Sequence, residues 1–308
     1  MDLAPVVIFA YNRLDHIQKT INALLNNYLS EKSEIFIYSD YARSDKDVLS
    51  ILQVRKYINE IKGFRKITLI ERDRNYGLSD NIIEGVTDIC NKYGKVIVLE
   101  DDLITSQYFL TFMNEAIDKY IDNPMVSSIH GYVYPTKTNL PDTFFIKGSD
   151  CWGWATWSSA WNKFEKNGSK LLEQIKSKKL EKEFNFNNTF DYVKMLQDQI
   201  DGKNNSWAIR WYASCFLNNM YILYPGKSLV TNIGFDGTGT HSGQSLIFNQ
   251  SNHLNKINIL DIPVINNEIA YEAFVNYFKL NKFYTSKFKK ALKNILPKIL
   301  LNMYRKVK

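Results

Sequence analysis

Val96-Ile97-Val98-Leu99-Glu100-Asp101-Asp102-Leu103 is the stretch that decides the fold, because four apolar residues run directly into three consecutive carboxylates. An uninterrupted apolar run of this kind is typical of a strand buried on both faces inside a parallel sheet. The acids then lie at the carboxyl end of that strand, which is where open α/β sheets bind their ligands. Neighbouring carboxylates also suit a hard divalent cation. The stretch therefore favours a site for a metal and a nucleoside diphosphate.

The same acids also fit the start of a helix. Asp102 would cap a helix that opens at Thr105-Ser106-Gln107-Tyr108, and the carboxylates would stabilise the positive end of its dipole. Taken alone, the stretch does not distinguish these two interpretations.

Three other apolar runs, at residues 5–10, 34–39 and 66–70, have the same form as the run at 96–99. Helical patterns separate them, at residues 17–25, 48–61 and 79–93. Four strands that alternate with three helices predict an α/β fold, with a mixed, mostly parallel, Rossmann-like sheet flanked by helices. No GxGxxG or GxxxxGK[ST] loop is present, which argues against dinucleotide oxidoreductases and P-loop proteins.

Polar side chains follow each expected strand. Because parallel strands bring their carboxyl ends to one edge of the sheet, these residues are expected to converge although they are spread over the first third of the chain. Each one alone also fits a turn residue or a solvated charge. The set consists of Asn12, Arg13, Asp40, Asn75, Asp101 and Asp102.

Composition excludes several classes of protein. The 308 residues, 45% apolar and 23% charged, are ordinary for a globular protein with a sizeable core. Three cysteines without a CxxC spacing indicate neither a disulfide framework nor a zinc site. The chain has no basic, apolar leader at its start and no run of about 18 apolar residues, so we expect a cytoplasmic protein that does not span the membrane.

The net charge of +7 is concentrated at the C-terminal end. Residues 273–308 contain ten Lys or Arg and no acid, which leaves −3 for the rest of the chain and argues against a nucleic-acid partner. From residue 284 onward a basic amphipathic helical tail is expected, which Pro297 would kink or divide. Such a tail suits an anchor on the inner face of the cytoplasmic membrane. A helix packed on the body is the alternative.

The second half of the chain is rich in tryptophan. Trp152 and Trp154 flank a glycine, and each fits either a sugar-stacking face beside a polar cleft or a place in the core. Residues 235–243 are rich in Gly and Thr, as in a loop that closes over a ligand or in an ordinary surface loop.

Together these segments resemble the GT-A fold glycosyltransferases over about residues 5–245. The Glu100-Asp101-Asp102 form of the acidic motif is similar to that of the Golgi N-acetylglucosaminyltransferase that acts on the mannose core of N-glycans. The Trp-Gly-Trp-Ala-Thr-Trp segment and residues 232–241 are similar to bacterial relatives encoded in surface-polysaccharide gene clusters.

The resemblance implies a nucleotide-sugar donor, with UDP as the expected nucleotide, and Mn²⁺ or Mg²⁺ bridging its diphosphate. Asp102 would ligate the metal, and Glu100 and Asp101 would contact the ribose or the donor sugar. The remaining nucleotide contacts would come from Ala10, Tyr11, Asn12, Arg13, Asp40, Asn75 and His241, the last from a loop that orders over the nucleotide.

Inversion at the sugar carbon requires a carboxylate that takes the proton of the acceptor hydroxyl. The relatives place an Asp next to a Trp before the final loop, whereas this chain has Asn205-Ser206-Trp207 there. The nearest acids are Asp198 and Asp201, and we favour Asp198 slightly.

The leading hypothesis is a metal-dependent, inverting hexosyl- or N-acetylhexosaminyltransferase that acts on a glycan or lipid-linked glycan in bacterial surface polysaccharide synthesis. Its domain would span residues 1–265, with a nucleotide-sugar half at 1–122 and an acceptor half at 123–265, followed by the tail at 266–308. The rivals are a sugar nucleotidyltransferase and a non-catalytic carbohydrate- or membrane-binding protein.

Overall fold

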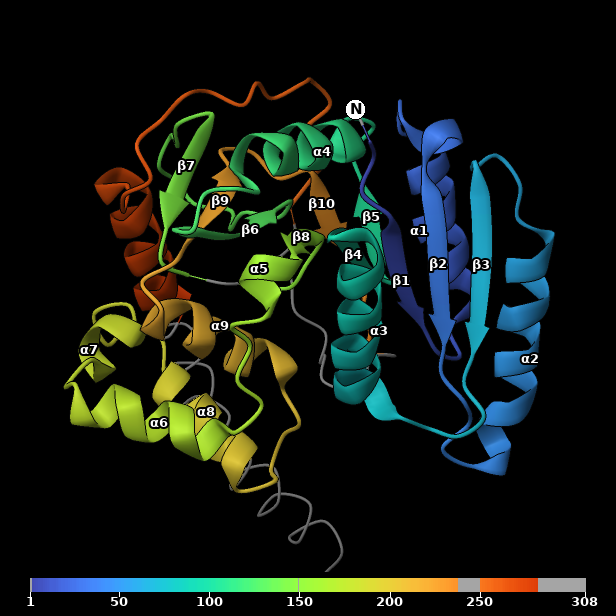
Figure 1. The fold of residues 1–308 in the computed structure, drawn as a ribbon, viewed down its shortest axis with the longest axis horizontal. Coiled ribbons are helices and arrows are strands. Elements are labelled where there is room, and N and C mark those ends of the chain that lie inside the picture. Colours follow the sequence, from blue (N-terminus) through green and yellow to red (C-terminus); the bar gives the residue numbers. More distant parts are fainter. Residues whose placement is uncertain (1, 149, 238–249, 282–308) are drawn as a thin grey trace, which may run out of the picture.

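The computed structural model describes residues 2–148, 150–237 and 250–281. Its centre is an eight-stranded sheet in the order β3-β2-β1-β4-β8-β6-β9-β7, in which only β7 and β8 run against the other six strands (Figure 1). The predicted mixed, mostly parallel sheet is confirmed. The strands are β1 (Val6–Ala10), β2 (Glu34–Ser39), β3 (Lys66–Glu71), β4 (Lys95–Glu100), β6 (Val126–His130), β7 (Thr143–Ile146), β8 (Trp154–Trp157) and β9 (Tyr221–Pro225).

The first four strands form the parallel part that the apolar runs predict. β1 lies between β2 and β4, with Val6 in register with Ile35 on one side and Ile97 on the other, and every residue of β1 is buried. The helices α1 (Leu14–Leu25) and α2 (Asp45–Glu60) cover one face of this part, and α3 (Gly77–Tyr93) covers the other (Figure 1). All carboxyl ends of these strands therefore reach the same edge.

The interpretation of Asp102 as a helix cap is wrong. Leu103–Thr105 form a short strand, β5, which pairs antiparallel with β10 (Val230–Asn232) in a separate two-stranded sheet. The next helix, α4, starts only at Phe109, and the side chain that accepts from its first turn is that of Asn27, at 3.0 Å from the N–H of Leu110. Asp102 thus lies in the tight connection between two strands.

Helices and aromatic residues fill the second half of the molecule. Trp154 on β8 packs against Trp161, Trp207 and Trp211, and its side chain is fully buried. The helices of this half are α4 (Phe109–Tyr120), α5 (Ser158–Trp161), α6 (Gly168–Ser177), α7 (Glu181–Phe184), α8 (Tyr192–Ile200) and α9 (Trp207–Leu217). A short 3₁₀ helix, η1 (Ser30–Lys32), belongs to the first half.

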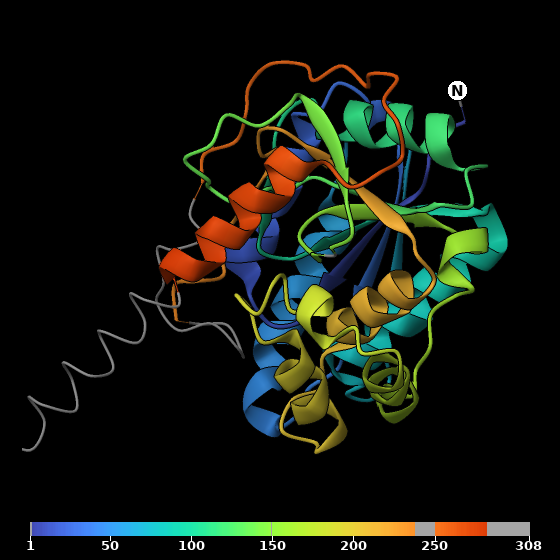
Figure 2. The ribbon, with the colours of Figure 1, turned by 90° about the vertical axis from the view of Figure 1, so that its left-hand side faces the viewer.

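A last helical segment, residues 268–281, packs on the body (Figure 2). Its Phe274 contacts Tyr134 and Tyr224, and its Phe278 contacts Phe186. The basic part of the expected tail, residues 282–308, lies outside the described residues, so the membrane anchor stays a prediction. Within the described part of the chain, no helix is both long enough and apolar enough to cross a membrane.

Candidate active site

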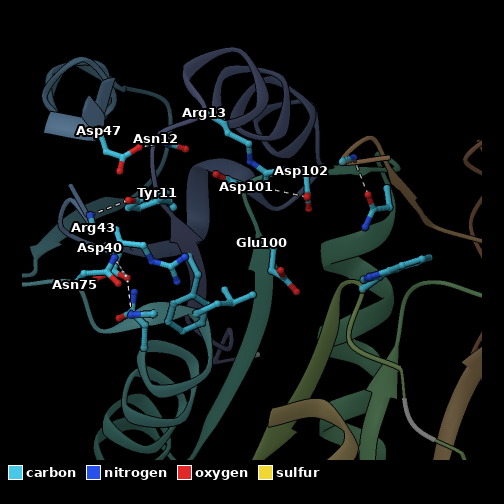
Figure 3. A pocket seen from close by; sticks show the side chains of 18 of the residues that line it. Tyr11, Asn12, Arg13, Asp40, Arg43, Asp47, Asn75, Glu100, Asp101 and Asp102 are labelled. Carbon is cyan, nitrogen blue, oxygen red and sulfur yellow. Dashed lines mark hydrogen bonds and ion pairs between the residues drawn. The ribbon is translucent and has the colours of Figure 1, made fainter. Parts of the chain in front are cut away.

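A cavity of about 450 Å³ opens at the carboxyl ends of β1, β2 and β4. The structure brings together nearly all the residues that the sequence places at strand ends (Figure 3). Those that line the cavity are Ala10, Tyr11, Asn12, Arg13, Asp40, Asn75, Glu100, Asp101, Asp102 and Trp152. For all of them except Trp152, which precedes the antiparallel β8, the convergence follows from the parallel sheet, since they lie at the carboxyl ends of β1, β2 and β4 or in the loops after β1 to β4.

Two of the three acids share one guanidinium. Nη2 of Arg13 donates to Oδ1 of Asp101 and, at 2.9 Å, to Oδ2 of Asp102. The other oxygens of these carboxylates, Asp101 Oδ2 and Asp102 Oδ1, are buried without a hydrogen-bond partner. Thr20 fixes the backbone between them by donating its hydroxyl to the carbonyl oxygen of Asp101 at 2.8 Å. Each of the two aspartates thus has one carboxylate oxygen bonded to Arg13 and one without a hydrogen-bond partner.

Burial and the neighbouring charges shift the pKa values of Glu100, Asp101 and Arg13 strongly. Burial raises the pKa of Glu100 to about 8, and the charges of Asp102 and Asp101 add to the effect. Burial also raises the pKa of Asp101 to about 6, although Arg13 opposes it. For Arg13, burial favours a lower pKa, but the two aspartates outweigh it and the pKa lies above its usual value. One guanidinium therefore does not satisfy three carboxylates, and the site favours a further cation.

Asp40 organises the loops that follow β2 and β3, which form one wall of the cavity. Its buried carboxylate accepts hydrogen bonds from the backbone N–H groups of Tyr41, Tyr76 and Gly77 and from the side-chain amide of Asn75. Gly77 is the first residue of α3, so the carboxylate also lies at the positive end of that helix. Asp40 thereby joins the loop after β2 to the loop after β3.

Two residues of this wall, Arg43 and Asp47, are absent from the sequence-based set. Tyr11 accepts a hydrogen bond at its hydroxyl from the backbone N–H of Arg43 at 2.9 Å, and Asn12 donates to Asp47 at 3.0 Å (Figure 3). Both lie a few residues after Asp40, in the loop after β2 and the start of α2, where polar residues that follow a parallel strand are expected to reach the same edge of the sheet. Leu78 and Asn81, at the start of α3, line the same wall.

The opposite wall comes from the segment after β10. Asn232, Gly234 and Phe235 line the cavity, and Phe235 meets the ring of Trp152 edge-on at 5.4 Å. The backbone N–H of Ile233 donates to the carbonyl oxygen of Asp102 at 2.9 Å. The sequence favours a loop over the ligand just after this segment, but no local pattern in it indicates that residues 232–234 lie beside Asp102.

The acids partly fit a divalent cation. Two buried, unpartnered carboxylate oxygens are the hard ligands that Mn²⁺ and Mg²⁺ prefer. Across residues 2–148, 150–237 and 250–281, however, no three His, Cys, Asp or Glu side chains are arranged as a complete metal site. A cation here would need ligands from its substrate, as is usual for Mg²⁺ bound with phosphates.

Trp154 does not offer its ring to this cavity, so the prediction that it stacks on a sugar is corrected. Its exposed fraction is 0%, and it is stacked on Trp207 at 5.2 Å. Trp152 lies two residues earlier, ahead of β8, and it does line the cavity. Gly153, with a φ of 65°, makes the turn that separates the two rings.

The predicted catalytic bases are not at the cavity. Asp198 lies on α8 and Asp201 directly after it, and neither lines the cavity. Lys194 pairs with Asp198 at 2.7 Å, and Lys203 pairs with Asp201 at 2.7 Å. The hydrogen bonds from these ammonium groups lower the pKa of each carboxyl. Their assignment as bases is therefore corrected. His241 lies outside the described residues.

Comparison with known proteins gives the family. The model of glycosyl transferase family 2 matches residues 6–179, more than half of the chain. No curated protein matches the chain.

Similar solved structures include a mannosyltransferase and two structures of S. aureus TarS. The mannosyltransferase PcManGT from Pyrobaculum calidifontis, in complex with GDP-Man and Mn²⁺, is 15% identical with a TM-score of 0.31, and the match covers 44% of this chain and 36% of that chain. S. aureus TarS 1–349 is 12% identical with a TM-score of 0.44, covering 74% and 60%. The same TarS segment in complex with UDP-GlcNAc is 13% identical with a TM-score of 0.33, covering 46% and 39%. Each match spans less than two thirds of the other protein.

Proposed function

The chain belongs to glycosyltransferase family 2, and on that premise we propose that it transfers a sugar from a nucleotide-sugar, with UDP as the nucleotide, to a hydroxyl group. The observation that carries the proposal is the cavity at the strand ends, where Arg13, Asp101 and Asp102 meet. A cavity of this size takes a nucleoside diphosphate, and its polar lining fits a polar ligand.

Mn²⁺ or Mg²⁺ is part of the proposal. Asp102 would hold the cation through its unpartnered Oδ1, and the adjacent Asp101 and Glu100 would face the ribose or the donor sugar. The cation supplies charge stabilisation for the departing diphosphate in place of a general acid. Arg13 carries a fixed positive charge at the same place, which adds to the attraction for a diphosphate.

The nucleoside would occupy the wall formed by Tyr11, Asn12, Asp40 and Asn75. Because Asp40 accepts four hydrogen bonds from its own loops, we assign it the role of holding this wall in shape. Trp152 would contact the sugar at the other wall, beside Phe235. The proposed reaction inverts the anomeric carbon: the acceptor oxygen, approaching from the side of Trp152, would bond to that carbon as its bond to the diphosphate breaks, and the hydroxyl proton would pass to a carboxylate of the cavity lining.

The cellular role is the finer part of the proposal. We propose a hexosyl- or N-acetylhexosaminyltransferase of bacterial surface polysaccharide synthesis, acting on a glycan or lipid-linked glycan, with the acidic motif used as in the Golgi N-acetylglucosaminyltransferase. Residues 1–265 would form the catalytic domain, with the donor half at 1–122. The tail, through the ten cations of residues 273–308, would hold the enzyme at the inner face of the cytoplasmic membrane.

Release of UDP from a panel of UDP-sugars tests the proposal. We expect release from at least one donor with Mn²⁺ or Mg²⁺, and little release after chelation with EDTA. Formation of a nucleotide-sugar and pyrophosphate from UTP and a sugar phosphate would instead identify a nucleotidyltransferase. Glycan binding without turnover of any nucleotide-sugar would contradict the proposed activity.

A vesicle assay tests the tail. Removing residues 285–308 leaves the packed segment 268–281 in place, so we expect unchanged turnover of soluble substrates. The truncated protein should no longer sediment with vesicles of anionic lipid. Equal sedimentation of both forms would contradict the proposed anchor.

A further inference from the structure

Gly234 lies directly against the carboxylate of Asp102. A Cβ atom at Gly234 would come 2.9 Å from Asp102 Cγ and even closer to Asp102 Oδ2. Carbon atoms in good contact are about 3.5–4.0 Å apart, so a side chain here would require the carboxylate to move. The carboxylate therefore occupies the space that any other residue would need for its side chain.

Backbone strain does not explain this glycine. Gly234 is absent from the positive-φ glycines of the described residues, so alanine fits its backbone. Its backbone N–H donates to Oδ1 of Asn232 at 2.7 Å, which an alanine would also do. The requirement for glycine thus comes mainly from the carboxylate of Asp102, with Oδ1 of Asn232, 3.2 Å from the added Cβ, as a second and looser neighbour.

The segment that carries Gly234 is fixed in place next to Asp102. Asn232 on β10 is in register with Leu103 on β5, and the N–H of Ile233 donates to the carbonyl oxygen of Asp102 at 2.9 Å. Because this pairing holds residues 232 and 233 to residues 102 and 103, and the N–H of Gly234 is bonded to Asn232, a new side chain at 234 has little room to move away. The carboxylate would have to rotate instead.

We propose that Gly234 is a positioning residue for the cation site of this enzyme. Arg13 donates to Asp102 Oδ2 at 2.9 Å, and the bare backbone of Gly234 borders the same oxygen. Together they fix the carboxylate so that only Oδ1 is left for a cation. This inference rests on the proposed function and deepens it, because it assigns the placement of the metal ligand to a residue on the opposite wall.

Gly234→Ala is the variant that tests the proposal. We expect the Mn²⁺ dissociation constant, measured by electron paramagnetic resonance with UDP present, to rise about 10-fold or more, since changing a group that orients a metal ligand costs about 10–100-fold in metal affinity. The Mn²⁺ concentration that gives half-maximal UDP release should rise in parallel. The Mn²⁺ affinity of Gly234→Ala within twofold of that of the wild type would overturn the proposal.

Gly168→Ala is the matched control. Gly168 on α6 also lacks a positive φ, and its added Cβ would meet a side-chain oxygen, that of Gln199, remote from the cavity. We expect this variant to bind Mn²⁺ as the wild type does. An equal loss of Mn²⁺ affinity in both variants would show a general effect of added side chains and would also overturn the proposal.

A double variant measures the contact without any metal. Asp102→Ala removes the group that collides with the new methyl, so adding Gly234→Ala to it should leave the thermal midpoint unchanged, whereas Gly234→Ala alone should lower it. If Gly234→Ala alone does not fold, the double variant should fold. If the double variant loses as much thermal stability as Gly234→Ala alone, the added methyl collides with a group other than Asp102, and the proposal is overturned. Wild-type protein that binds no Mn²⁺ would refute the proposed function itself, separately from these outcomes.

Discussion

Two groups of acids, the strand-end trio Glu100-Asp101-Asp102 and the helix pair Asp198 and Asp201, have opposite surroundings. The trio is packed into a cavity wall with one guanidinium and two unpartnered oxygens, and burial raises the pKa of Glu100 and of Asp101. The pair lies on or next to α8 beside Lys194 and Lys203, whose hydrogen bonds lower both pKa values. Acids whose charge is poorly satisfied are the ones available for a ligand.

The largest expected effect of this contrast is on catalysis. Asp102→Asn keeps the shape of the side chain and removes its charge, so we expect kcat/KM to fall by about 10³-fold, or about 4 kcal/mol in transition-state stabilisation. Steady-state transfer assays at saturating Mn²⁺ would measure it. Turnover within tenfold of the wild type, in a variant with a normal circular dichroism spectrum, would remove Asp102 from the metal site.

The next effect is on stability. Arg13→Met leaves Asp101 and Asp102 buried without their cation, which costs about 3 kcal/mol in proteins. Urea unfolding without metal should show this loss. Mn²⁺ with UDP should restore part of it, since the metal supplies the missing charge. A variant as stable as the wild type without metal would show that the trio is less charged than the structure indicates.

Glu100→Gln tests the raised pKa. A carboxyl group whose folded-state pKa is raised to about 8 stabilises the fold below its unfolded pKa, near 4.5, and this contribution is lost as the pH rises through 8. Glu100→Gln should therefore stabilise the metal-free protein by about 2 kcal/mol at pH 8.5 relative to the wild type, and by much less at pH 5. Thermal midpoints at both pH values measure the difference, and a pH-independent difference would contradict it.

The smallest effects are expected for the helix pair. Asp198→Asn and Asp201→Asn remove exposed ion pairs with lysines, which contribute about 1 kcal/mol at most. We expect kcat to stay within twofold of the wild type in each variant. A 100-fold loss of kcat in either variant, with KM unchanged, would show that the aspartate takes part in catalysis.

The parallel half of the site could be predicted from the sequence because the fold itself gathers its residues. An apolar run followed by a polar residue occurs at Ala10, Ser39 and Leu99, and a parallel sheet must deliver all three ends to one edge. Arg13, Asp40 and the acids could therefore be placed together without knowledge of any contact.

The second half could not be predicted in this way. Gly234 reaches Asp102 through the pairing of β10 with β5, two short strands more than 120 residues apart, whose register no local pattern specifies. Trp152 and Trp154 stand on either side of Gly153 in the sequence, and the turn at this glycine places one at the cavity and the other in the core. Asp198 and Asp201 are the acids nearest to Trp207 in the sequence, and nearness in sequence does not place a side chain at the cavity.

Calorimetric titration of UDP into the wild type and into Asp102→Asn, each with and without Mn²⁺, tests the central claim most directly. The claim is that the trio holds a cation which binds the diphosphate. We predict that Mn²⁺ tightens UDP binding to the wild type at least about 10-fold and has little effect on the variant. Equal UDP affinity in all four titrations would contradict it.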